Sequence, residues 1–196
     1  MALFERRETP PTYSDPKDYK PFLRRDFRRM FAYCERTEAF LGGEEAFEID
    51  HFRTQQSFPA LRCSYPNLYY CCRKCNLYKS SKWPSAGQIA AGLVFADACV
   101  EDPYVSHLLE GWDGSLVELT PCGKFTNAHV RLDRPDVCEW RRKRKQARKD
   151  LPMFRSLETS LVQALDYYGS DSTEIEQKIE AIRRFIDESQ DRFRVS

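Results

Sequence analysis

The chain has 196 residues, a formal net charge of +1 and a hydrophobic content of 41%. This length is sufficient for one domain, or for one small module with a helical extension, with a hydrophobic core of its own. Because the sequence has no apolar run of about 18 residues or more and no apolar segment of the secretory type near its start, we expect a cytoplasmic protein with no membrane partner.

The N-terminal part of the chain predicts an extended arm followed by one helix. Residues 1–21 are rich in proline and in charged residues, which favours an extended conformation. From Phe22 to about Tyr33, apolar residues recur near helical spacing and arginines fill the other face, which predicts a helix.

The next segment predicts a strand, a loop, a second strand and a short helix. Apolar and acidic residues alternate over 47–50, so that Asp50 shares a face with Glu48, and His51 shares the other face with Ile49. A return strand is predicted over 68–71, after a loop that ends at Asn67. A helix of about two turns then fits between position 75 or 76 and Pro84. This order of elements is typical of the ββα-metal arrangement.

The remainder of the chain is predicted to be mainly helical, with one small hairpin. Ser85 and Gln88 form a capping-box pattern that opens a short helix ending at Leu93. The hairpin is predicted from strands at 115–120 and 125–132. The further predictions are a basic helix over 133–150 that Pro152 ends or kinks, a helix over 157–168 closed by Gly169, and a helix over 175–186, the last two forming a helical hairpin.

Three residues of the central segment suit the hydrolysis of a phosphodiester. Near neutral pH this reaction needs a base to deprotonate water and a cation to neutralise the charge that develops. His51 suits the first role because an imidazole titrates near the working pH. Asp50 and Asn76 suit the second role because a carboxylate and an amide carbonyl are hard oxygen donors, matched to Mg²⁺ or Mn²⁺.

Residues 30–82 resemble the HNH endonuclease superfamily, in the variant that has asparagine in place of the last histidine. The resemblance implies a ββα-metal fold with a general base, two ligands for one divalent cation, and an asparagine that ties the loop and aims the base. These roles fall on His51, on Asp50 and Asn76, and on Asn67, in that order. Lys79, one helical turn after Asn76, is a further candidate that can steady the phosphate or the transition state. Residues 113–120 and 132–135 resemble the corresponding tail of stand-alone bacterial HNH proteins.

The resemblance also raises the question of a structural zinc ion. Many members carry two CxxC pairs that bind zinc under the ββα unit, and Cys72 with Cys75 matches one pair. Cys34 matches half of the other, but Phe31 stands where the remaining cysteine is expected. Cys63, Cys71 or a distant residue is an alternative fourth ligand, and Phe31 can instead fill the space by packing. We favour loss of the zinc, because three ligands leave an open site.

Charge along the chain is strongly divided. Residues 141–149 contain seven cations, whereas residues 83–123 contain no lysine or arginine. Beside a nuclease motif, the basic segment predicts contacts with nucleic-acid phosphates, most simply those of double-stranded DNA. The candidate contacts are Arg141, Arg142, Lys143, Arg144 and Lys145. We expect the acidic segment 97–118 to face away from the nucleic acid.

The sequence therefore predicts an α+β protein with an HNH nuclease core inside a mainly helical chain. Its expected parts are an arm over 1–21, a nuclease domain over 22–132 and a helical region over 133–196. We expect a metal-dependent DNA endonuclease, by analogy the effector of a bacterial anti-phage defence system. The alternatives are a nuclease subunit that is inactive without a partner such as an ATPase, and a non-catalytic zinc-ribbon protein that binds nucleic acid.

Overall fold

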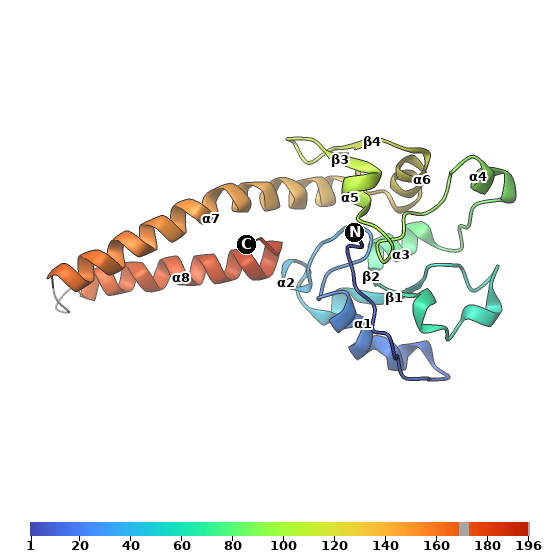
Figure 1. The fold of residues 1–196 in the computed structure, drawn as a ribbon, viewed down its shortest axis with the longest axis horizontal. Coiled ribbons are helices and arrows are strands. Elements are labelled where there is room, and N and C mark those ends of the chain that lie inside the picture. The colour runs from blue at the N-terminus through green and yellow to red at the C-terminus, as the bar shows by residue number, and fades with distance from the viewer. Residues whose placement is uncertain (169–172, 196) are drawn as a thin grey trace. The chain divides into compact units, whose positions relative to one another are not determined.

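A computed structural model describes residues 1–168 and 173–195. It combines helices with two small antiparallel hairpins, as the predicted α+β class requires (Figure 1). The elements are α1 (Lys20–Asp26), α2 (Glu38–Leu41), β1 (Phe47–His51), β2 (Leu68–Cys72), α3 (Arg73–Lys79), α4 (Ala86–Ala90), α5 (Pro103–Ser106), β3 (Leu108–Glu110), β4 (Leu116–Glu118), α6 (Pro121–Val130), α7 (Pro135–Tyr168) and α8 (Thr173–Phe193).

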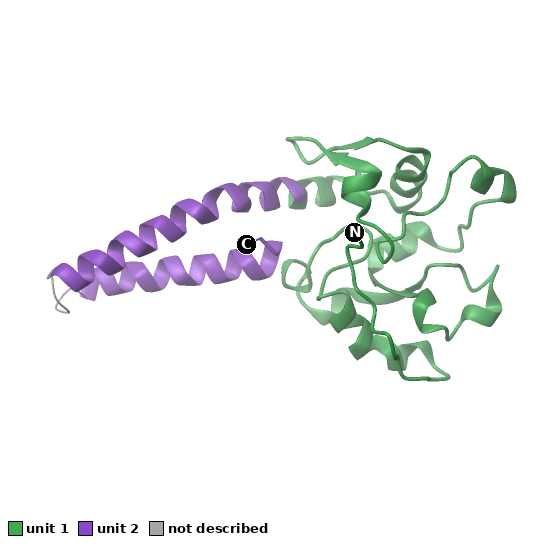
Figure 2. Ribbon diagram, viewed as in Figure 1, with its two compact units in different colours: residues 1–140 green, residues 141–196 purple. Residues whose placement is uncertain are grey.

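The chain forms two compact units, residues 1–140 and residues 141–196 (Figure 2). The predicted N-terminal arm is part of the first unit and not a separate element. Its Phe4 is buried, and the backbone amides of Leu3 and Phe4 donate to the carbonyl of Ala98. Together with the ion pair between Arg7 and Asp26 at 2.8 Å, these contacts hold the start of the chain against the first unit.

Strands β1 and β2 pair in antiparallel fashion, with Asp50 opposite Tyr69 and His51 opposite Leu68. Both strands agree with the prediction. Helix α3 follows β2 directly and starts at Arg73, earlier than predicted, because the side chain of Cys72 accepts a hydrogen bond from the backbone N–H of Cys75 and so caps the helix. The three elements therefore follow one another as strand, strand and helix.

Two predictions about the first unit are wrong in their boundaries. Helix α1 ends at Asp26 and does not continue to Tyr33, because Arg28 and Arg29 take left-handed backbone conformations with φ of 52° and 58°. Helix α4 has the predicted capping box but stops at Ala90.

The small hairpin exists but consists of other residues. Strand β3 pairs with β4, and the segment predicted as the second strand is helix α6. The side chain of Thr120 accepts from the N–H of Gly123, and Pro121 occupies the first turn. These two features start a helix and outweigh the apolar pattern on which the strand prediction depended.

The second unit contains most of α7 and all of α8. Helix α7 continues through Pro152, so of the two predicted effects of this proline, ending or kinking the helix, the ending is wrong, and the predicted helices over 133–150 and 157–168 are one helix. Leu151 is fully buried beside the proline, and the rings of Phe154 and Phe185 lie 4.3 Å apart, so contacts between the two helices stabilise the continuous helix. The predicted cap Gly169 lies outside the described residues. No helix in the described ranges has the length and apolar character needed to cross a membrane.

Candidate active site and thiol cluster

Strand β1, the loop after it and helix α3 line a cleft of about 620 Å³. Polar side chains from all three segments reach it. They include Glu48, Asp50 and His51 from β1, Gln55 from the loop and Asn76 from α3. Three of the predicted site residues, His51, Asp50 and Asn76, therefore lie in one cleft, as the order of elements predicts.

The hydrogen bonds of His51 define its tautomer. Nε2 lies 2.9 Å from the backbone oxygen of Arg62, and Nδ1 lies 2.9 Å from the side-chain nitrogen of Gln55. Because a carbonyl oxygen only accepts, Nε2 carries the proton and Nδ1 accepts from Gln55. Burial lowers the pKa of His51 below its ordinary value of 6.5, so the neutral ring predominates at neutral pH. Nδ1 is then the basic atom.

Asn67 ties the loop that carries the partner of His51. Its side-chain oxygen accepts from the N–H of Arg53 at 2.8 Å, and its amide nitrogen donates to the carbonyls of Arg53 at 3.0 Å and Leu61 at 3.3 Å. Leu61 directly precedes Arg62, whose carbonyl contacts His51. Asn67 thus supports the position of His51 indirectly, through the loop that carries Arg62.

Asp50 is buried, and both of its oxygens already have donors. The hydroxyl of Tyr33 donates to Oδ2 at 2.6 Å, and Nζ of Lys79 donates to Oδ1 at 2.9 Å. Lys79 is fully buried and also donates to the backbone oxygen of His51 at 2.7 Å. The predicted phosphate contact of Lys79 does not fit this position, because a fully buried ammonium cannot reach a bound phosphate. Lys79 instead holds the end of β1.

The amide of Asn76 contacts a different carboxylate from the one predicted. Its Nδ2 donates to Oε2 of Glu48 at 2.8 Å, and Arg73 pairs with the other oxygen of Glu48 at 3.0 Å. Glu48 was predicted to share a face with Asp50, with no role in the site. Its position two residues before Asp50 on a strand was the available signal. Carboxylate and amide oxygens at the cleft fit a hard cation such as Mg²⁺.

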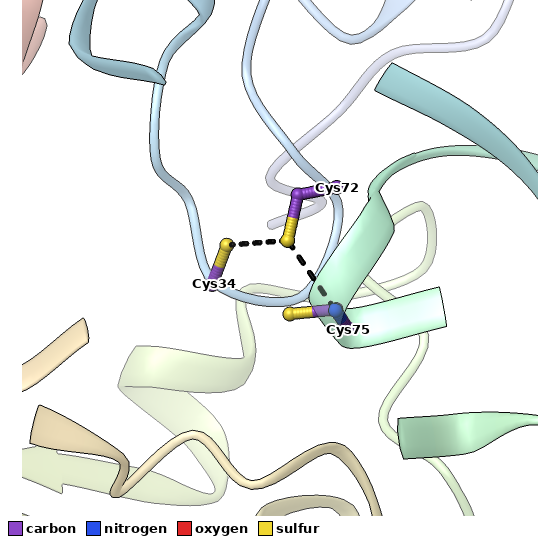
Figure 3. A group of neighbouring side chains, drawn as sticks. All are labelled: Cys34, Cys72 and Cys75. Atoms are coloured by element: carbon purple, nitrogen blue, oxygen red, sulfur yellow. Dashed lines mark hydrogen bonds between the residues drawn. The ribbon is translucent and has the colours of Figure 1, made fainter. Parts of the chain in front are cut away.

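Three buried cysteines form a second cluster, at the end of β2, the start of α3 and the loop that carries Cys34 (Figure 3). Their sulfurs lie within 4.8 Å of one another, which allows a metal ion such as zinc to bind. The Cys34 and Cys72 sulfurs are 3.8 Å apart, close to the edge of a tetrahedron with Zn–S bonds of about 2.3 Å.

The other proposed zinc ligands lie elsewhere. The thiol of Cys63 donates to the backbone oxygen of Ser14 at 2.9 Å, and the thiol of Cys71 donates to the backbone oxygen of Cys72 at 3.5 Å. Among the residues that the structure describes, the cluster consists of Cys34, Cys72 and Cys75.

The three thiols differ in acidity. Burial alone raises the pKa of Cys34, but hydrogen bonds from the other two thiols and the charges of nearby arginines reverse this effect and hold it well below its ordinary value. The pKa of Cys72 is raised to about 11, chiefly because it shares a hydrogen bond with Cys34. The cluster thus favours a single thiolate, on Cys34.

The predicted phosphate contacts on the basic segment are only partly accessible. Arg141 and Arg144 are buried, together with Ala147 and Leu151, and these positions follow the spacing of one helical face. The prediction of phosphate contacts is therefore wrong for Arg141 and Arg144. Arg142 and Lys143 are exposed, and Lys145 is partly exposed.

Comparison with known proteins adds no relative: no protein-family model, curated protein or solved structure matches this chain.

Proposed function

We propose that the protein is a metal-dependent endonuclease that hydrolyses DNA phosphodiesters in the cleft between β1 and α3. The observation that carries this proposal is the environment of His51. A backbone carbonyl holds the Nε2 proton, burial keeps the ring neutral, and the basic Nδ1 is paired with an exchangeable amide. An imidazole held in this way suits a general base.

In this proposal a water molecule replaces the amide of Gln55 beside Nδ1 of His51. Nδ1 accepts a proton from that water as the water oxygen bonds to phosphorus, the bond between phosphorus and the leaving oxygen breaks, and the leaving oxygen takes a proton from solvent. The hydrogen bond from Nε2 to Arg62 keeps the ring in position during proton transfer. Asn67 supports this geometry through the loop.

Oxygen donors on β1 and α3 would hold the divalent cation. Asn76 and Glu48 face each other at 2.8 Å, and Asp50 lines the same cleft. A bound Mg²⁺ or Mn²⁺ neutralises charge on the phosphate and on the leaving oxygen. Because both oxygens of Asp50 already accept hydrogen bonds, Glu48 supplies the carboxylate ligand that the sequence predicted at Asp50. Asp50 contributes through its contact with Lys79, which fixes the end of the strand that carries His51.

We propose Arg73, in place of Lys79, as the residue that contacts the phosphate. Its side chain lines the cleft and is 82% exposed, and its partner Glu48 lies at the same edge. A solvent-exposed guanidinium can pair with a phosphate and exchange its carboxylate partner.

Cleavage of supercoiled plasmid DNA tests the proposal. The full-length chain is incubated with DNA in Mg²⁺, in Mn²⁺ or in EDTA, and the His51→Ala variant is treated in parallel. We expect nicked or linear product with either metal ion, no product with EDTA and no product with His51→Ala. The matched control is His107→Ala, because His107 pairs with Glu101 and Thr120, which do not line the cleft.

Two results would contradict the nuclease proposal. Cleavage by His51→Ala at the wild-type rate would show that His51 is not the general base. Tight DNA binding without cleavage, unchanged in His51→Ala, would favour the non-catalytic alternative. If the isolated chain is inactive, the same comparison is made in the complex that co-purifies with it, and activity there that depends on His51 supports a nuclease subunit.

A further inference from the structure

The thiol cluster offers a metal ion three ligands, and the residue at the expected fourth position packs elsewhere. The ring of Phe31 stacks on that of Tyr70, with centroids 5.5 Å apart and planes 8° from parallel. It brings no donor atom to the sulfurs. Structural zinc sites are almost always closed by four ligands, so the donor set present does not fit a structural zinc ion.

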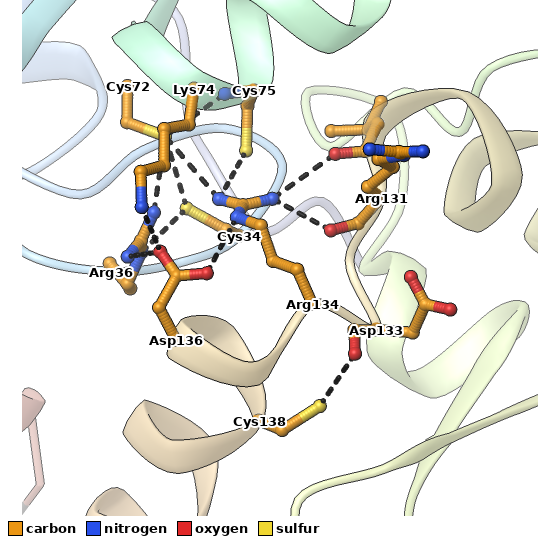
Figure 4. A network of polar contacts seen from close by, with 11 residues as sticks. Cys34, Arg36, Cys72, Lys74, Cys75, Arg131, Asp133, Arg134, Asp136 and Cys138 are labelled. Atoms are coloured by element: carbon orange, nitrogen blue, oxygen red, sulfur yellow. Dashed lines mark hydrogen bonds and ion pairs between the residues drawn. The ribbon is translucent and has the colours of Figure 1, made fainter.

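Two guanidinium groups contact the three sulfurs instead (Figure 4). Nη2 of Arg134 lies 3.2 Å from the sulfur of Cys75 and 3.8 Å from that of Cys72. Arg36 reaches Cys34 with Nε at 3.5 Å and Cys72 with Nη2 at 3.6 Å. Each sulfur therefore already has a cationic partner.

Both guanidinium groups are held in place from behind. Arg134 donates from Nη1 to the carbonyls of Val130 at 3.2 Å and Arg131 at 2.8 Å. The carboxylate of Asp136 pairs with Nε of Arg134 at 3.1 Å and with Nη1 of Arg36 at 2.8 Å. Arg36 is 2% exposed and Arg134 is 8% exposed, so neither side chain can swing into solvent without opening the packing.

A divalent cation at the centre of the cluster would add its charge next to two buried cations. Arginine does not deprotonate in proteins and offers no acceptor to a metal, so it can neither lose its charge nor become the missing ligand. Repulsion in a buried site is weakly screened. The surroundings of the sulfurs thus disfavour an ion that the sulfur spacing alone would allow.

We propose that the guanidinium of Arg134, assisted by that of Arg36, acts as a brace that holds the three cysteines in place of a zinc ion. The chain then keeps its β2–α3 junction without a structural metal. Arg134 lies just before α7, and Arg36 lies in the loop after Cys34. The two arginines and Asp136 therefore connect the start of α7, the junction and that loop.

Metal analysis of the full-length protein tests the metal-free state. Wild-type protein purified without chelators is examined for zinc content, for its melting temperature with and without EDTA, and for thiolate-to-metal absorption bands when Co²⁺ is added to the reduced protein. We expect no stoichiometric zinc, no change in melting temperature with EDTA and no Co²⁺ bands.

Substitution of Arg134 tests the brace. Arg134→Met keeps an unbranched side chain and removes the charge. It leaves the sulfur of Cys75 without its cationic partner, and Cys72 and Asp136 lose one of theirs and keep Arg36. We expect the melting temperature to fall by about 5 to 10 °C. The matched control is Arg142→Met, the same change at an exposed position of α7, which should leave the melting temperature unchanged.

Two outcomes would overturn the inference. The first is stoichiometric zinc in the wild-type protein that disappears in Cys34→Ser, together with a melting temperature that EDTA lowers. The second is an Arg134→Met protein that melts at the wild-type temperature.

Discussion

The cleft and the thiol cluster both lie in the first unit and are lined by adjacent residues of α3, but they differ in their exposure to solvent. Asn76 faces the cleft, where its partner Glu48 is partly exposed and its hydrogen bond can exchange with a ligand. Cys75, one residue earlier, is fully buried and lies 3.2 Å from the guanidinium of Arg134. The first region is open to solvent and adjustable, and the second is closed and fixed.

The proposed chemistry and the stability of the fold therefore depend on different groups. A general base and a metal ligand need hydrogen-bond partners that substrate, water or metal can replace. The brace formed by Arg134 needs hydrogen-bond partners that stay in place. We therefore expect substitutions at the cleft to change cleavage and leave stability intact, and substitutions among the buried groups to lower stability first.

Lys79→Met should have the largest effect on stability. It leaves the carboxylate of Asp50, which is 3% exposed, without its cation. Breaking a buried ion pair in this way costs about 3 to 5 kcal/mol of unfolding free energy. Chemical denaturation measures the loss, and Lys82→Met, at an exposed position three residues on, should stay within about 0.5 kcal/mol of wild type. Equal stability of the two variants would show that the Asp50 pair contributes nothing.

Asn76→Ala should affect the metal and not the fold. It removes one oxygen ligand, and we expect cleavage at limiting Mg²⁺ to fall by about 10 to 100-fold, with partial recovery at high Mg²⁺. Asn76→Asp retains an oxygen donor and should keep more activity than the alanine variant. A melting temperature lowered as much as in Lys79→Met would contradict the separation of the two regions.

The pH dependence of cleavage should follow the titration of His51. Because burial lowers the pKa of His51 below 6.5, the neutral base predominates above that pH. We expect kcat/KM to be constant near pH 7 and to fall about tenfold per pH unit below the lowered pKa, where the ring becomes protonated. A midpoint well above 6.5 in the rate profile would be inconsistent with a buried His51 as the base.

Part of the fold followed from local pattern. The alternation of residues 47–50 predicted β1, and Ser85 with Gln88 predicted the cap of α4. The second strand of the small hairpin was misplaced because an apolar run favours a strand or a buried helix equally, and only the cap at Thr120 distinguishes them. The continuity of α7 through Pro152 depends on contacts with α8, which local sequence does not contain.

The candidate site divides in the same way. His51, Asp50 and Asn76 were predicted from residue type and spacing, and β1 and α3 bring them to one cleft. The burial of Lys79 and the contact between Asn76 and Glu48 depend on the packing of α3 against β1. Arg134 contacts residues 59 positions earlier in the chain, and its place among the cysteines could not be inferred from its surroundings in the sequence.

The most direct measurement is the cleavage rate and the melting temperature of His51→Ala, determined on the same preparation beside wild type. We predict a cleavage rate lower by about 100-fold or more. The melting temperature should be unchanged, because His51 lies in the cleft, which is open to solvent. Undiminished cleavage by a fully folded His51→Ala protein would contradict the proposal that His51 is the general base.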